Sequence, residues 1–116
     1  MVVINYTGSM CSLNQKYTGK YRLTNKYRAS KYELQLYCKD AMRGKTILFK
    51  PLKLKVSINY RYGRKGTDID NYLKFTLDSM NGIVYDDDSQ IFELAVTKEY
   101  VKKDNVGCTI SIEEML

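Results

Sequence analysis

Six of the thirteen acidic residues in this chain lie within residues 67–91, and all six are aspartates. Asp68 and Asp70 form a D-x-D pair, and three consecutive aspartates follow at residues 86–88. Clustered carboxylates in a chain of net charge +6 suggest a divalent metal ion that acts on a bound polyanion. Since the sequence contains no histidine, histidine-based triads and histidine-ligated iron are excluded, and an oxygen-bound Mg²⁺, Mn²⁺ or Ca²⁺ is expected.

Each acidic group also has a purely structural interpretation. An aspartate at the start of a helix can cap it and interact favourably with its dipole, but capping does not need both members of the pair. The triplet could be a solvated turn, although a bound cation would relieve the repulsion among three like charges. An EF-hand is excluded, because counting from Asp68 places Leu73 where its loop needs glycine and Ser79 where it needs glutamate.

Lys74 lies four residues after Asp70, so the two would share one face of a helix. Its functional interpretation is a lysine that contacts the scissile phosphate or stabilises the developing negative charge. Its structural interpretation is an ordinary surface ion pair worth ~0.3–0.5 kcal/mol. Asp78 lies four residues further on and is expected to have the structural role of pairing with Lys74.

The charges are divided sharply along the chain. Residues 1–66 hold fifteen Lys and Arg against two acids, and residues 67–116 hold four Lys against eleven acids, giving net charges of +13 and −7. Such asymmetry is a hint of nucleic-acid binding. Eight of the eleven tyrosines lie in the basic part, where they could stack on bases, although most are individually expected in the core or at its boundary.

Cysteine usage and hydropathy bound the cellular setting. Cys11, Cys38 and Cys108 are odd in number and widely spaced, so we expect buried thiols in a reducing compartment. No stretch is long and apolar enough to span a membrane, and the first ten residues lack the basic and apolar regions of a signal peptide. We therefore expect a cytoplasmic protein with one domain over residues 1–116 and with neither a membrane nor a nucleotide cofactor as partner.

The hydrophobic periodicity predicts the elements that must position the acidic residues. It indicates a strand over residues 2–6, a long loop to residue 24, a helix to about residue 43, a strand over 52–60, a helix over 70–80, a short strand over 83–85 and a hairpin of strands over 92–101 and 106–113. In the strand over 52–60, apolar residues alternate with polar ones that include Lys53 and Lys55, which predicts one buried and one basic face. The order predicts an α/β (mixed α+β) fold with a mixed four- to five-stranded sheet and two main helices.

The blocks DIDNYLK, LDSMNGIVY and DDDSQI, in this order and spacing, resemble the signature of the RusA-type Holliday junction resolvases, or crossover junction endodeoxyribonucleases. The resemblance covers residues 68–91, and the segment SLNQKY at residues 12–17 agrees more loosely. Beyond residue 92 only the strand pattern is compatible. The sequence departs from the pattern at Tyr72, where the family usually has Leu. The resemblance implies a small, dimeric, magnesium-dependent endonuclease of a bacterium, prophage or virus.

The resemblance also implies a role for individual residues. Asp68, Asp70 and Asp88 would form the metal site, and Asp87 would be a neighbouring acid of lesser weight, while the first member of the triplet has no fixed counterpart. Lys74 would be the essential basic residue, and it would share catalysis with the three metal-site acids. The implied cofactor is Mg²⁺, for which Mn²⁺ could substitute.

These observations lead to one principal hypothesis and two alternatives. The principal hypothesis is a magnesium-dependent, structure-selective endonuclease that resolves four-way junctions by paired symmetric nicks, in DNA recombination and repair, as a twofold homodimer. The alternatives are a non-catalytic branched-DNA-binding module with a structural cation, and a metal nuclease of another branched-DNA specificity. For contact with the DNA backbone, the candidates are Asn14, Lys16, Arg61, Arg64 and Lys65.

Overall fold

A four-stranded mixed sheet forms the scaffold of the protein, whose computed structural model describes residues 1–12, 17–18 and 22–116. β6 is antiparallel to β1 and β4, and β5 is parallel to β4. A separate two-stranded sheet joins β2 to β3. The strands are β1 (Val2–Thr7), β2 (Tyr17–Thr18), β3 (Arg22–Leu23), β4 (Leu54–Tyr62), β5 (Ile91–Tyr100) and β6 (Gly107–Glu114), with the order β1-β6-β4-β5 in the large sheet.

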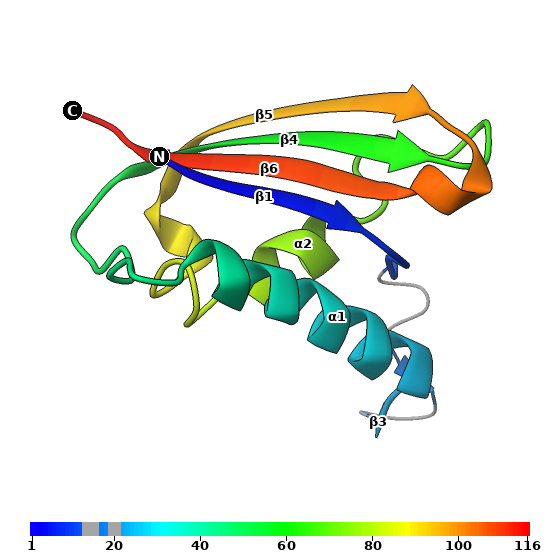
Figure 1. Cartoon of the computed structure of the whole chain (residues 1–116), viewed down its shortest axis with the longest axis horizontal. Helices are drawn as coiled ribbons and strands as arrows, with labels where there is room; N and C mark the ends of the chain where they lie inside the picture. Colours follow the sequence, from blue (N-terminus) through cyan, green and yellow to red (C-terminus); the bar gives the residue numbers. More distant parts are fainter. Residues whose placement is uncertain (13–16, 19–21) are drawn as a thin grey trace.

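The two α-helices, α1 (Asn25–Ala41) and α2 (Leu73–Met80), lie on one face of this sheet, and the opposite face carries neither (Figure 1). α1 begins where sequence predicts, because Thr24 Oγ1 accepts a hydrogen bond of 3.1 Å from the Tyr27 amide. The helix buries a narrow stripe that includes Leu34 and Cys38. The predicted α+β class, with two helices and a mixed sheet, is therefore confirmed. Within the described residues, no helix is long and apolar enough to cross a membrane.

The core lies between the sheet and the helices. β4 alternates as predicted, with buried side chains toward the helices and partly exposed ones on the open face. The strand is shifted by two residues relative to the prediction, because Leu52 donates its amide to the Phe49 carbonyl in a turn. At its other end, the Tyr62 carbonyl accepts the Val101 amide at 2.8 Å. The large, fully buried side chains include Tyr6, Leu34, Leu54, Ile58, Tyr60, Tyr62, Phe75, Met80, Tyr85, Ile110 and Ile112.

The predicted hairpin between the last two strands is wrong. β5 and β6 do not pair with each other, because β4 lies between them and pairs with both. Burial explains this order: β6 buries Cys108, Ile110 and Ile112 and takes a central place, whereas most of β5 is exposed and occupies an edge. A turn containing the 3₁₀ segment η3 (Lys103–Asn105) carries the chain back past the end of β4.

Two other local predictions are wrong. α2 begins at Leu73 and not at Asp70, because residues 68–72 form turns in which Asn71 donates its amide to the Asp68 carbonyl and Leu73 to the Asp70 carbonyl. Residues 83–85 form a turn and no strand. Gly82 has a φ of 77°, and the amides of Ile83 and Val84 both donate to the Met80 carbonyl. Asp70 is therefore on a loop and cannot share a helix face with Lys74.

Candidate functional site

The loop of residues 63–72, hereafter the acidic loop, leaves the end of β4 and leads directly into α2. Asp68 and Asp70 are both exposed on it. Beneath them, the buried Tyr62 side chain directs its hydroxyl to the carbonyls of Asp68 and Ile69, each 3.1 Å away. The turn bonds within residues 68–73 and this hydroxyl hold the backbone that carries the pair, while both carboxylates stay available to a ligand from solvent.

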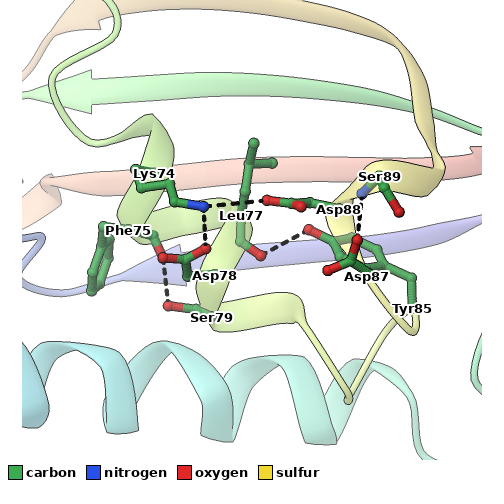
Figure 2. Close-up of polar contacts among 9 residues, drawn as sticks. All are labelled: Lys74, Phe75, Leu77, Asp78, Ser79, Tyr85, Asp87, Asp88 and Ser89. Carbon is green, nitrogen blue, oxygen red and sulfur yellow. Dashed lines mark hydrogen bonds and ion pairs between the residues drawn. The ribbon is translucent and has the colours of Figure 1, made fainter.

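Lys74 lies in the first turn of α2, with its side-chain nitrogen between two carboxylates (Figure 2). Its Nζ is 2.9 Å from Asp78 Oδ1 and 3.6 Å from Asp88 Oδ2. The hydrogen bond with Asp78, and then the negative charges of Asp78 and Asp88, raise the pKa of Lys74 above its ordinary value. The ammonium therefore stays protonated at neutral pH. The predicted pairing of Asp78 with Lys74 is confirmed.

The three consecutive aspartates point to different partners. Asp86 accepts the Lys50 amide at 3.0 Å. Asp87 caps the 3₁₀ segment η2 (Asp88–Gln90) by accepting the Ser89 amide at 3.1 Å, and its hydrogen bonds with Ser89 lower the pKa of its carboxyl group. Asp88 is the member that lies beside Lys74. Its role as a ligand, and the lesser role of Asp87, remain predictions.

Two buried side chains that the sequence reasoning did not single out hold η2 beside α2. Tyr85 donates its hydroxyl to the Leu77 carbonyl at 2.8 Å, which ties the turn after α2 back onto the helix (Figure 2). Gln90 donates its side-chain amide to the carbonyls of Leu48 and Leu52, at 2.9 and 3.2 Å. These contacts set the position of Asp88 relative to Lys74. The partners of Gln90 lie far back along the chain, so its contacts become evident only in the fold.

Arg64 and Lys65 line an open cavity of about 460 Å³ together with Asp68 and Asn71. The backbone of this segment is braced from β5, since Lys98 Nζ donates to the Thr67 carbonyl at 2.8 Å. A nearby tyrosine hydroxyl, that of Tyr100, accepts the Gly66 amide at 3.3 Å. Two basic side chains and one carboxylate around the same cavity could accommodate a phosphate beside a cation. No pattern in the sequence indicates this brace from β5.

The other predicted DNA contacts are placed differently. Arg61 lies on the open face of the sheet, where its guanidinium donates to the Tyr6 carbonyl at 2.6 Å, Thr109 Oγ1 at 2.8 Å and the Asn105 carbonyl at 3.0 Å. Those bonds give Arg61 a structural role, and its DNA contact remains a prediction. Asn14 and Lys16 lie outside the described residues.

The open face is not uniformly basic. Lys55 Nζ is 3.9 Å from Glu93 Oε2 on the neighbouring strand. In the sheet register, Glu113 of β6 also lies opposite Lys55, and Glu99 of β5 lies beside Arg61. The basic face that β4 alone predicts is thus offset by acids from both flanking strands.

The donor chemistry of the site suits a hard divalent cation. Asp68, Asp70 and Asp88 offer carboxylate oxygens, and Mg²⁺ is commonly held by one or two carboxylates together with water and substrate phosphate. In the described part of the chain, no group of three or more acidic or cysteine side chains gathers closely enough to hold an ion. The acids are thus available as two groups: the pair on the acidic loop, and Asp88 beside Lys74.

Comparison with known proteins provides independent information. A family model described as Endodeoxyribonuclease RusA matches residues 10–113. A Bacillus subtilis (strain 168) protein described as uncharacterized protein YqaN is 44% identical over 43 residues. The aligned stretch makes up 37% of this chain and 30% of that protein.

Proposed function

The chain belongs to the RusA endodeoxyribonuclease family, and from this membership we propose that it resolves Holliday junctions. The proposed reaction is a pair of symmetric nicks at a four-way DNA junction, dependent on Mg²⁺ or on Mn²⁺ as a substitute. The observation that carries the proposal is the ion pair of Asp88 with Lys74, which lies at the start of the helix that follows the acidic loop. A lysine that can bind the phosphate thus lies beside a carboxylate that can bind a metal ion.

In this proposal, the chain's own residues bind and orient the scissile phosphate. Asp68 and Asp70 on the acidic loop and Asp88 beside Lys74 would together hold the cation, which would supply Lewis-acid stabilisation of the phosphate and favour deprotonation of the attacking water. Lys74 stays protonated and neutralises negative charge that develops on the phosphate or the leaving oxygen. Asp78 keeps the ammonium charged and close to Asp88.

Two basic residues at the start of the acidic loop support the proposal that the protein binds the DNA backbone. Arg64 and Lys65 line the same cavity as Asp68, so a phosphate bound by them would lie near the acidic pair. A junction requires two nicks related by symmetry, and a twofold homodimer with two separate sites meets that requirement. The cellular role would be DNA recombination and repair.

The test is incubation of the purified protein with a labelled four-way junction and a matched linear duplex, with Mg²⁺ and with EDTA. We expect paired symmetric nicks in the junction alone, and none with EDTA. Asp70→Asn should abolish the nicks and retain junction binding. Binding without nicks under any divalent metal would favour the non-catalytic module. Cutting of other branched DNA, or of the duplex as well, would leave a nuclease of different specificity.

A further inference from the structure

We propose that Tyr62 is a positioning residue of the metal site, which holds the acidic loop in register with the helix that carries Lys74. The inference rests on the proposed function, because it concerns the same metal site. The hydrogen bonds of Tyr62 go to the backbone of the acidic loop. Its hydroxyl reaches the backbone carbonyls of Asp68 and Ile69, directly before the second acid of the pair.

A second tyrosine on the same strand holds the helix. Tyr60 and Tyr62 are two residues apart in β4, so both point from one face of the strand toward the helices. Tyr60 donates its hydroxyl to Thr76 Oγ1 at 2.8 Å, and Thr76 in turn donates to the Tyr72 carbonyl at 2.8 Å. One hydroxyl of β4 therefore anchors the acidic loop, and the other anchors α2.

The rings make this arrangement rigid. Tyr60 and Tyr62 stack with ring centroids 5.6 Å apart and an interplanar angle of 22°. Tyr72, the residue that precedes α2, meets the Tyr62 ring edge-on at 5.5 Å and 74°. Side chains packed this closely leave little freedom for the hydroxyls. The spacing of the two anchors is consequently set by the strand and not by the loop.

At the acidic pair and at the start of α2, side-chain caps and packing contribute little to the position of the backbone. Tyr72 occupies the N-cap position of α2 but makes no side-chain capping hydrogen bond. Asp68 and Asp70 are exposed, so packing does not fix their positions. Outer-shell groups that orient metal ligands commonly contribute about 10–100-fold to metal affinity or activity. Tyr62, only 2% exposed, is placed to make such a contribution.

The variant that tests the inference is Tyr62→Phe, which removes the hydroxyl and keeps the ring. The matched control is Tyr6→Phe, whose lost hydroxyl is also fully buried and donates to a backbone carbonyl, that of Ser9, at 2.7 Å, with Glu33 Oε2 as a second acceptor at 3.2 Å. Binding of Mn²⁺ to each purified protein without DNA is measured by calorimetry. Amide hydrogen exchange over residues 63–73 and thermal unfolding are followed in parallel.

We expect Tyr62→Phe to weaken Mn²⁺ binding by about 10-fold and to speed exchange in the acidic loop, while Tyr6→Phe retains wild-type metal affinity. The inference is overturned if Tyr62→Phe binds Mn²⁺ as the wild type does, or if both variants lose affinity equally. A wild type that binds Mn²⁺ but cuts no junction contradicts the proposed function alone, since the comparison of the variants still decides the role of Tyr62. A wild type that binds no Mn²⁺ contradicts both.

Discussion

Lys74 Nζ lies 3.6 Å from Asp88 Oδ2, although the end of α2 and a tight turn separate the two residues along the chain. The contact depends on Tyr85, which ties that turn to α2, and on Gln90, which fixes η2. A cationic and an anionic group are thereby held at one place by supports that lie outside the contact itself.

Asp88→Asn should reduce junction cleavage at least about 100-fold, because even residues that only support metal ligands contribute about 10–100-fold. Asp86→Asn is a matched control, since it makes the same change in the same triplet at a carboxylate that accepts the Lys50 backbone amide. Single-turnover cleavage at saturating Mg²⁺ measures both. Equal losses in the two variants would show that the triplet acts merely through its total charge.

Lys74→Gln should lower the single-turnover rate by about 10²–10³-fold, the usual cost of removing one group that stabilises charge in a transition state. Junction binding measured with Ca²⁺ should change by only a few-fold, because one exposed lysine contributes little to affinity for a whole junction. Lys102→Gln, on an exposed residue outside the site, is the control. Loss of binding in step with loss of cleavage would contradict a catalytic role for Lys74.

The double variant Arg64→Gln/Lys65→Gln should weaken junction binding and flatten its dependence on salt. Each lost phosphate contact lowers the slope of log affinity against log salt by about one, so the expected change is about two. Fluorescence anisotropy between about 50 and 200 mM salt measures the slope. An unchanged slope would show that Arg64 and Lys65 do not contact DNA phosphates.

Arg61→Gln should act mainly on stability, because its guanidinium donates to three oxygens within the fold. Hydrogen bonds from charged groups contribute about 1.5–3 kcal/mol when partly shielded from water, and we expect a loss near the lower end of that range. Urea unfolding measures it, with Arg64→Gln as the control that should leave stability nearly unchanged. If Arg61→Gln instead leaves unfolding unchanged and weakens junction binding, the role first predicted for Arg61 is correct.

The three cysteines should resist alkylation at pH 8 in the native protein and react rapidly in denaturant. Burial raises the pKa of Cys38 and of Cys108 to about 12, and it also raises that of Cys11. Because an unfolded thiol ionises near pH 8.5, the folded state binds more protons above that pH. The thiols' contribution to stability is therefore complete below about pH 8 and is lost as the pH rises toward 12. Urea unfolding between pH 7 and 10 measures this decline.

Sequence predicted the features that depend on local patterns. The alternation of β4, the N-terminal cap at Thr24, the glycine stop after α2 and the Lys74–Asp78 pair all involve residues close in sequence, whose spacing determines which side chains share a face. The acidic residues could be identified as candidates for the same reason. Their chemistry is a property of the side chains and does not depend on the fold.

Features that depend on distant partners could not be predicted. The hairpin between β5 and β6 is the expected connection for neighbouring strands, and only the burial demands of the whole sheet place β4 between them. Tyr60 lies on the predicted buried face of its strand and Tyr62 just beyond the strand's predicted end, and nothing in their sequence neighbourhood indicates that their hydroxyls reach Thr76 and the acidic loop. Arg61 shows the same limit, since its internal acceptors lie near the two ends of the chain, far from Arg61 in the sequence.

The pairing of β1 with β6 has a consequence for how the protein is made. Within the described part of the chain, β6 is the strand that pairs with β1, and the register joins Val2 to Ile112. On the ribosome, β1 therefore emerges long before its partner, and the sheet cannot close until β6 has been synthesised. The acidic loop and α2 are translated earlier but gain their final support only then. The proposed nuclease activity should accordingly appear only after translation of β6.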